Sequence, residues 1–170
     1  MVGYGNIGSQ VSVMAEAMGM KVVYYDVVPK LPHGNATQAR DLAELLKTSD
    51  VVTLHVPGGA STRNMINERT LAHLRRGALL INYSRGDVVD LDALKKYIDG
   101  GVVAGAAIDV FPEEPERSGD PFSTVLQNLP NVILTPHNSA NTGSSGVAAA
   151  EIFLTNLARY VTGEPLHNGR

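Results

Sequence analysis

The stretch Gly3-Tyr4-Gly5-Asn6-Ile7-Gly8 decides the fold of this chain. Its glycines have the spacing G-x-G-x-x-G. The first glycine permits a tight turn, the second lets the main chain approach a pyrophosphate, and the third lets a helix pack closely on a strand. A helix that begins at such a turn offers unpaired N–H groups and the positive end of its dipole to phosphates. Because glycine-rich turns are common, the motif indicates a dinucleotide site only together with the residues that follow it.

Asp26 supplies the second part of the dinucleotide pattern. Residues 21–25 form a short β-branched run that predicts a strand, and Asp26 ends it, 18 positions after Gly8. A carboxylate about 20 residues beyond the glycines accepts hydrogen bonds from the adenosine ribose hydroxyls and repels a 2′-phosphate. We therefore expect NAD rather than NADP, although Lys30 stands near enough to weaken the exclusion of NADP. The alternative is a surface aspartate that merely ends a strand.

Short apolar runs alternate with helical patterns along the rest of the chain. This alternation predicts an α/β domain with a doubly wound parallel sheet, the Rossmann arrangement. The predicted strands are 21–25, 51–54, 78–81, 103–108 and 131–134, and the predicted helices are 7–18, 41–47, 67–73, 91–99 and 145–161. Only Met1 and Val2 precede the glycine turn, so we expect the first strand to be truncated. We place the NAD-binding domain at residues 1–162 and a C-terminal tail at residues 163–170.

The composition argues against several classes of function. The chain has 170 residues, a formal net charge of −3 and no cysteine, so disulfides, thiol catalysis and cysteine-ligated zinc are excluded. No metal site is expected. Basic residues are neither in excess nor clustered, which argues against nucleic-acid binding. No apolar run approaches the roughly 18–20 residues of a membrane span, and the N-terminus lacks the pattern of a signal peptide. We expect no membrane partner and a cytoplasmic location.

Three ionisable residues directly follow predicted strands, where ligands bind in open α/β sheets. They are Arg85, Glu114 and His137. Oxidation of a hydroxy acid needs a cation for the carboxylate, which an arginine fork provides, and a base for the hydroxyl proton, which a histidine provides. A neighbouring glutamate would raise the pKa of the histidine and orient its ring. Each residue alone is more often structural, and their joint placement at one sheet edge favours the catalytic interpretation.

Five motifs follow one another along the chain: Gly-Tyr-Gly-Asn-Ile-Gly at 3–8, Leu-His-Val-Pro at 54–57, Asn-Tyr-Ser-Arg-Gly at 82–86, Asp-Val-Phe-Pro-Glu-Glu-Pro at 109–115 and Thr-Pro-His at 135–137. In this order they resemble the D-isomer-specific 2-hydroxyacid dehydrogenase family. The resemblance runs from residue 1 to about residue 137, with a looser match beyond.

The resemblance implies a role for each matching residue. His137 would be the acid/base, Glu114 its partner and Arg85 the group that binds the substrate carboxylate. Asp109 would contact the nicotinamide carboxamide. The implied cofactor-binding set is Gly3, Gly5, Asn6, Ile7, Gly8, Asp26, His55, Val56, Pro57, Tyr83, Ser84, Arg85, Asp109, His137 and Ala140.

The substrate is indicated by two further segments. Residues 30–37 and 118–122 are similar to the branch of the family that oxidises 3-phosphoglycerate in serine biosynthesis, which makes that acid the favoured substrate. Residues 138–142, Asn-Ser-Ala-Asn-Thr, resemble other branches, so glyoxylate or hydroxypyruvate reduction is the alternative.

The family builds a substrate-binding domain from a segment before the glycine turn and a segment after the final helix. The chain contains neither, so we expect it to bind NAD(H) and to turn over substrate weakly or not at all by itself. Cofactor domains of the family pair with one another, which implies a homodimer. The alternative from another class is a non-catalytic NAD(H)-binding oligomerisation module.

Overall fold

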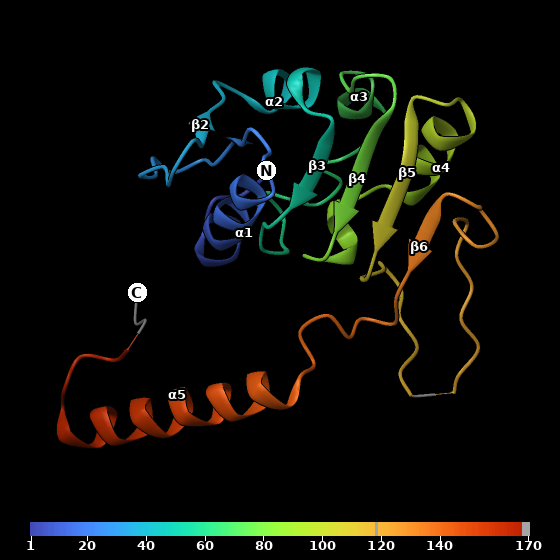
Figure 1. The fold of residues 1–170 in the computed structure, drawn as a ribbon. Coiled ribbons are helices and arrows are strands. Elements are labelled where there is room, and N and C mark those ends of the chain that lie inside the picture. The colour runs from blue at the N-terminus through green and yellow to red at the C-terminus, as the bar shows by residue number, and fades with distance from the viewer. Residues whose placement is uncertain (118, 168–170) are drawn as a thin grey trace. The chain divides into compact units, whose positions relative to one another are not determined.

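The computed structural model describes residues 1–117 and 119–167 and divides into two compact units (Figure 1). The first unit is Met1–Pro136, and the second begins at His137. The first unit contains two parallel sheets and four α-helices, and the second contains the helix α5, Gly143–Thr162.

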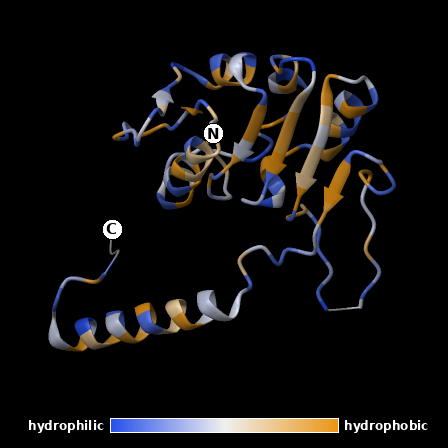
Figure 2. Cartoon of the chain, in the orientation of Figure 1, coloured by the Kyte–Doolittle hydropathy of each residue, from blue (hydrophilic) through white to orange (hydrophobic). Residues whose placement is uncertain are grey.

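A four-stranded parallel sheet lies at the centre of the first unit. Its strands follow one another in sequence order: β3 (Val51–Leu54), β4 (Ala78–Asn82), β5 (Val103–Ile108) and β6 (Val132–Leu134). The register pairs Leu54 with Asn82 and Asn82 with Ile108, so the carboxyl ends of these strands are aligned. Figure 2 shows β3, β4 and β6 as strongly hydrophobic, as expected for strands of a buried parallel sheet.

Val2 joins a second, two-stranded sheet to the first. That second sheet pairs β1 (Val23–Tyr24) with β2 (Thr37–Gln38). Val2 makes parallel bridges to Tyr25 and Leu54; its N–H donates to the carbonyl of Thr53 at 2.9 Å, and its carbonyl accepts the N–H of His55 at 2.7 Å. The expected stub of a first strand is thus present between β1 and β3. The resulting order is β2-β1-Val2-β3-β4-β5-β6, and its first six positions have the order of the dinucleotide-binding sheet.

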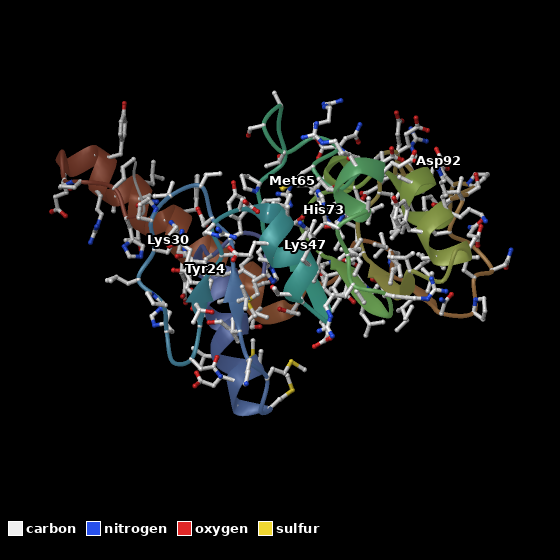
Figure 3. All side chains as sticks on the ribbon, turned by 90° about the horizontal axis from the view of Figure 1, so that it is seen from above. Tyr24, Lys30, Lys47, Met65, His73 and Asp92 are labelled. Carbon is white, nitrogen blue, oxygen red and sulfur yellow. The ribbon has the colours of Figure 1, made fainter. Side chains whose placement is uncertain are left out.

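Helices pack on both sides of this arrangement. α2 (Leu42–Thr48), α3 (Glu68–Leu71) and α4 (Leu91–Asp99) form a row in which each helix contacts the next. Figure 3 shows α1 (Asn6–Ala17) on the opposite side of the sheet from α3 and α4. Most of the largest fully buried side chains are leucines and isoleucines. Those from α2, α3 and α4 and from β3 to β5 are Leu45, Leu46, Leu54, Leu71, Leu80, Leu94 and Ile108. The predicted doubly wound α/β class is confirmed.

The structure differs from the predicted elements mainly where the chain is polar. β2 was not predicted, because Thr37 and Gln38 are exposed and show no apolar alternation. α3 is shorter than predicted, since Asn67 is not its first residue but its N-cap. The 3₁₀ turn η1, Gly86–Val88, was not predicted either. α5 extends the predicted helix slightly at both ends. It is capped by Thr142 at its start and ends before Gly163, whose φ is 73°. The boundary at residue 162 between domain and tail stays a prediction.

Candidate functional site

Two of the three motif glycines are required by the fold of the turn itself. Gly3 has a φ of 90°, and a Cβ there would lie 2.4 Å from the carbonyl oxygen of His55. A Cβ on Gly8 would lie 2.3 Å from the carbonyl oxygen of Gly3. A side chain on Gly3 would therefore push the turn away from the segment after β3, and a side chain on Gly8 would push α1 away from Gly3.

Gly5 has a different reason to be glycine. It is the N-cap of α1, has an ordinary φ of −80°, and no atom lies within 4 Å of the position of a Cβ. Neither conformation nor internal packing therefore demands glycine here. Its missing side chain leaves open space at the helix N-terminus, beside the exposed residues Asn6 and Ile7. A pyrophosphate would need such space to approach the main-chain N–H groups closely, and its binding at Gly5 stays a prediction.

Asp26 lies directly beside the glycine turn. Its Oδ2 accepts the N–H of Tyr4 at 2.8 Å, and its Oδ1 accepts the N–H of Val28 at 2.9 Å. The half-buried carboxylate thus links the turn to the end of β1. Asp26 follows Gly8 by 18 positions in the sequence, and the structure places it against the glycine turn. The two parts of the predicted dinucleotide pattern are therefore adjacent.

The segment after β3 lies against the same turn. The carbonyl of His55 and Cγ1 of Val56 are the nearest atoms to a Cβ built on Gly3. The ring Nε2 of His55 lies 3.1 Å from the hydroxyl of Thr53, and burial lowers the pKa of His55. The carbonyl of the exposed Pro57 accepts the hydroxyl of Thr62 at 2.7 Å. His55 and Val56 therefore border the glycine turn, and cofactor binding by His55, Val56 and Pro57 stays a prediction.

Arg85 is held on a turn that Asn82 organises. The fully buried carboxamide of Asn82 donates to the carbonyl of Arg85 at 2.9 Å and accepts both the N–H and the hydroxyl of Ser84. The guanidinium of Arg85 donates to the carbonyl of Ser84 at 2.7 Å, and the side chain is exposed. Tyr83 is 44% exposed. The sequence interpretation did not single out Asn82, although the motif residues 82–86 contain it.

Gly86 brings this turn against the segment after β5. A Cβ on Gly86 would lie 2.0 Å from both the carbonyl carbon and oxygen of Phe111. The Oε1 of Glu114 accepts the N–H of Phe111 at 2.9 Å. Arg85 and Glu114 are therefore carried by two turns that touch through Gly86 and Phe111. Glycine at position 86 was another signal that the sequence interpretation missed, since close main-chain contact requires it.

Asp109 lies at the end of β5 and is fully buried. Its Oδ1 accepts the hydroxyl of Thr135, and its N–H donates to the carbonyl of Asn82 at 3.1 Å. Asp109 therefore ties the ends of β4, β5 and β6 together. A contact between Asp109 and a nicotinamide stays a prediction.

His137 and Ala140 belong to the second unit. His137 is exposed and has a φ of 48°, in the left-handed region that is uncommon for residues other than glycine. The carbonyl of Ala140 accepts the N–H of Thr142 at 3.1 Å and the hydroxyl of Ser145, so it is part of the turn that caps α5. The pairing of His137 with Glu114 stays a prediction.

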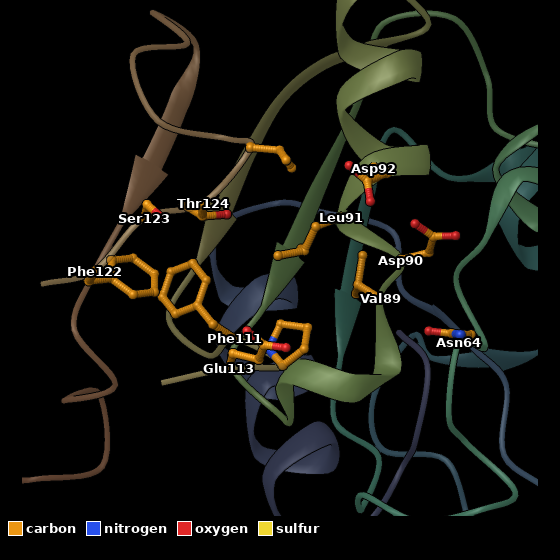
Figure 4. Close-up of a pocket in the computed structure, with 12 residues that line it drawn as sticks. Asn64, Val89, Asp90, Leu91, Asp92, Phe111, Glu113, Phe122, Ser123 and Thr124 are labelled. Carbon is orange, nitrogen blue, oxygen red and sulfur yellow. The ribbon is translucent and has the colours of Figure 1, made fainter. Parts of the chain in front are cut away.

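A groove of about 650 Å³ lies elsewhere in the first unit (Figure 4). It runs between the start of α4, with Asp90 and Asp92, and the segment that holds Phe111 and Phe122. The rings of Phe111 and Phe122 pack edge to face, with their centroids 4.7 Å apart. Glu113 lines this groove, whereas no residue of the predicted catalytic or cofactor set does. The groove is therefore separate from the glycine turn.

The match to known families agrees with this geometry. Residues 1–139 match the family described as D-isomer specific 2-hydroxyacid dehydrogenase, NAD binding domain. The chain belongs to this family. Its curated relatives include the D-3-phosphoglycerate dehydrogenases of Haemophilus influenzae and of Escherichia coli. The first is 51% identical over 145 residues, which are 85% of this chain and 35% of the relative. The second is 50% identical over 142 residues, which are 84% of this chain and 35% of the relative.

Solved structures of the family are similar over nearly the whole chain. The D-isomer-specific 2-hydroxyacid dehydrogenase of Lactobacillus delbrueckii, complexed with NAD, has a TM-score of 0.87 and 36% identity, covering 96% of this chain and 52% of that one. The D-lactate dehydrogenase of Lactobacillus jensenii with NAD⁺ has a TM-score of 0.86 and 34% identity, and the match covers 98% of this chain and 53% of that one. The D-isomer-specific 2-hydroxyacid dehydrogenase of Xanthobacter autotrophicus in complex with NADPH has a TM-score of 0.86 and 32% identity. The match covers 98% of this chain and 67% of that one.

This NAD-binding domain spans about a third of the length of its curated relatives. Among residues 1–117 and 119–167, no group of three or more histidine, aspartate or glutamate side chains is placed to hold a metal ion. Within those same ranges, no helix has the length and apolar character needed to cross a membrane.

Proposed function

We propose that this chain is the cofactor-binding half of an oxidoreductase that transfers a hydride between a D-2-hydroxy acid and NAD. The observation that carries the proposal is Gly5, whose missing side chain serves no purpose within the fold and leaves room at the start of α1. The position of Asp26 beside the same turn supports NAD over NADP, because its carboxylate would repel a 2′-phosphate.

The chemistry follows from three side chains. When bound, NAD supplies the acceptor for the hydride that leaves the C2 carbon of the hydroxy acid. Arg85 binds the substrate carboxylate through its guanidinium fork. His137 takes the proton of the hydroxyl group, and Glu114 orients the imidazole and raises its basicity. The exposed position of Arg85 leaves its guanidinium accessible to a small acid.

The favoured substrate is 3-phosphoglycerate. It is supported by the curated relatives, which are D-3-phosphoglycerate dehydrogenases of about 50% identity. Glyoxylate or hydroxypyruvate is the alternative, because residues 138–142 resemble other branches of the family. We further propose a domain of residues 1–162, pairing of two copies through this domain, and a cytoplasmic location.

Titration of the purified chain with NADH, followed by the fluorescence of the reduced nicotinamide, tests cofactor binding. We expect saturable binding, and an absence of binding at millimolar NADH would contradict the proposal. Fusing the chain to the substrate-binding domain of the Escherichia coli relative then tests the reaction. Oxidation of 3-phosphoglycerate by the fusion supports the enzyme, whereas cofactor binding without any turnover favours a non-catalytic module.

A further inference from the structure

Two buried tyrosines form a stacked pair next to the glycine turn. Tyr4, the second residue of the motif, is 3% exposed, and Tyr24 at the end of β1 is 1% exposed. Their ring centroids are 3.9 Å apart, with an angle of 22° between the ring planes. Since a dinucleotide motif tolerates any residue at position 4, the burial of an aromatic ring there calls for a local reason.

The hydroxyl groups of this pair hold the middle and the end of one segment, residues 27–33. The hydroxyl of Tyr24 donates to the carbonyl of Lys30 at 3.0 Å, and these two residues lie close together in Figure 3. The hydroxyl of Tyr4 accepts the N–H of His33 at 3.1 Å and is 2.7 Å from the hydroxyl of Ser12 on α1. The hydroxyl groups of two buried side chains, Tyr4 and Tyr24, therefore attach segment 27–33 to the core.

This segment directly follows Asp26, the residue proposed to select the cofactor. The N–H of Val28 donates to the same carboxylate of Asp26 that receives the N–H of Tyr4. The segment also carries Lys30, whose ammonium group would attract the 2′-phosphate that Asp26 repels. On the proposed binding of NAD, the choice between NADH and NADPH would depend on where segment 27–33 is held.

We propose that Tyr4 and Tyr24 are specificity-determining residues for the cofactor. They fix segment 27–33 so that the carboxylate of Asp26 stays against the glycine turn and Lys30 cannot move to pair with a 2′-phosphate. This inference rests on the proposed binding of NAD. It assigns selectivity to side chains that do not themselves reach the ribose, so both are positioning residues.

The test measures the dissociation constants of NADH and NADPH for the purified chain by fluorescence. In Tyr4→Phe and in Tyr24→Phe, the dissociation constant of NADPH divided by that of NADH should fall about fivefold. This change corresponds to the loss of one ordinary hydrogen bond. Tyr97→Phe is the matched control, since its hydroxyl donates to the carbonyl of Glu68 at 3.1 Å on α3. That variant should keep the wild-type ratio. A general loss of stability weakens both cofactors alike and leaves the ratio unchanged.

A surface variant keeps the test decisive if a tyrosine variant fails to fold. A Cβ on the exposed Gly34 would lie 1.6 Å from a carboxylate oxygen of Glu16, whose other oxygen accepts the N–H of Asn35. The end of the Glu16 side chain can rotate away from this Cβ, but Gly34 also has a φ of 55°, a conformation that strains alanine. Gly34→Ala therefore strains the main chain directly after the segment without entering the core, and the same fall in the ratio is expected. Wild-type ratios in all folded variants, or an equal fall in Tyr97→Phe, would overturn the inference. Failure of the wild-type chain to bind NADH would instead overturn the proposed function.

Discussion

The side-chain amide of Asn82 donates to the main-chain carbonyl of Arg85 at 2.9 Å, three residues further along the chain. The same carboxamide accepts the N–H and the hydroxyl of Ser84, and no part of Asn82 is exposed. One buried polar group thus satisfies three partners and defines the turn on which the candidate substrate-binding arginine lies.

Replacing this carboxamide should destabilise the chain. Asn82→Ala leaves the buried partners on Ser84 without an acceptor, so the free energy of unfolding should fall by about 1–3 kcal/mol. Chemical denaturation followed by circular dichroism measures the change. Asn131→Ala is the control, because the amide of Asn131 also donates to a main-chain carbonyl, that of Ala104, but is exposed. Equal losses in both variants would contradict the organising role of Asn82.

Gly86 should be intolerant of the smallest side chain. Gly86→Ala places a Cβ 2.0 Å from the carbonyl of Phe111, and the main chain must move to accept it. We expect a loss of stability of about 2 kcal/mol or more, within the range of strongly overpacked sites. Gly146→Ala on α5 has open space around its Cβ and should be neutral or stabilising, since alanine favours helix more than glycine does. Thermal unfolding of both variants decides the matter.

The three motif glycines should separate into two classes. Gly3→Ala and Gly8→Ala should lower the melting temperature, because each new Cβ would meet a main-chain carbonyl. Gly5→Ala should leave the melting temperature nearly unchanged and weaken NADH binding about tenfold or more, since the methyl group occupies the space expected for the pyrophosphate. If Gly5→Ala binds NADH as the wild type does, that space does not hold the cofactor.

The pH dependence of stability should contain a contribution from His55. Burial lowers the pKa of His55 below its ordinary value of 6.5, so the unfolded chain binds the proton more tightly than the folded chain. The stability that this histidine contributes is therefore fully present above pH 6.5 and is lost as the pH falls through the lowered pKa. The difference in unfolding free energy between wild type and His55→Gln should be constant above neutral pH and should shift against the wild type below it. A difference that does not vary between pH 8 and pH 5 would contradict this.

The fold was largely predictable because its signals are local. The glycine spacing, the alternation of apolar runs and the position of Asp26 each specify a neighbouring element, and all of these are present. β2 could not be predicted, since its two exposed residues are in a strand only because β1 lies beside them. The short α3 shows the same limit, because the capping box of Asn67 and Thr70 sets where that helix begins.

The candidate site was predicted as a set of charged residues, and the polar groups that hold them were not singled out. Arg85 and Glu114 attract notice because they are ionisable and follow strands. Asn82 and Gly86 act through a buried carboxamide and through the absence of a side chain, and neither property can be recognised without the partner segments. The pairing of Glu114 with His137 remains a prediction.

The single residue that serves as the first strand has a kinetic consequence. Val2 and Gly3 exchange main-chain hydrogen bonds with Thr53, His55 and Tyr25, and these bonds both join the two sheets and hold the glycine turn. Local opening of these hydrogen bonds would release the glycine turn and separate the two sheets in one event. A bound dinucleotide would oppose that opening, so the amide protons of Val2, Gly3, Tyr25 and His55 would exchange with solvent more slowly as the cofactor concentration rises.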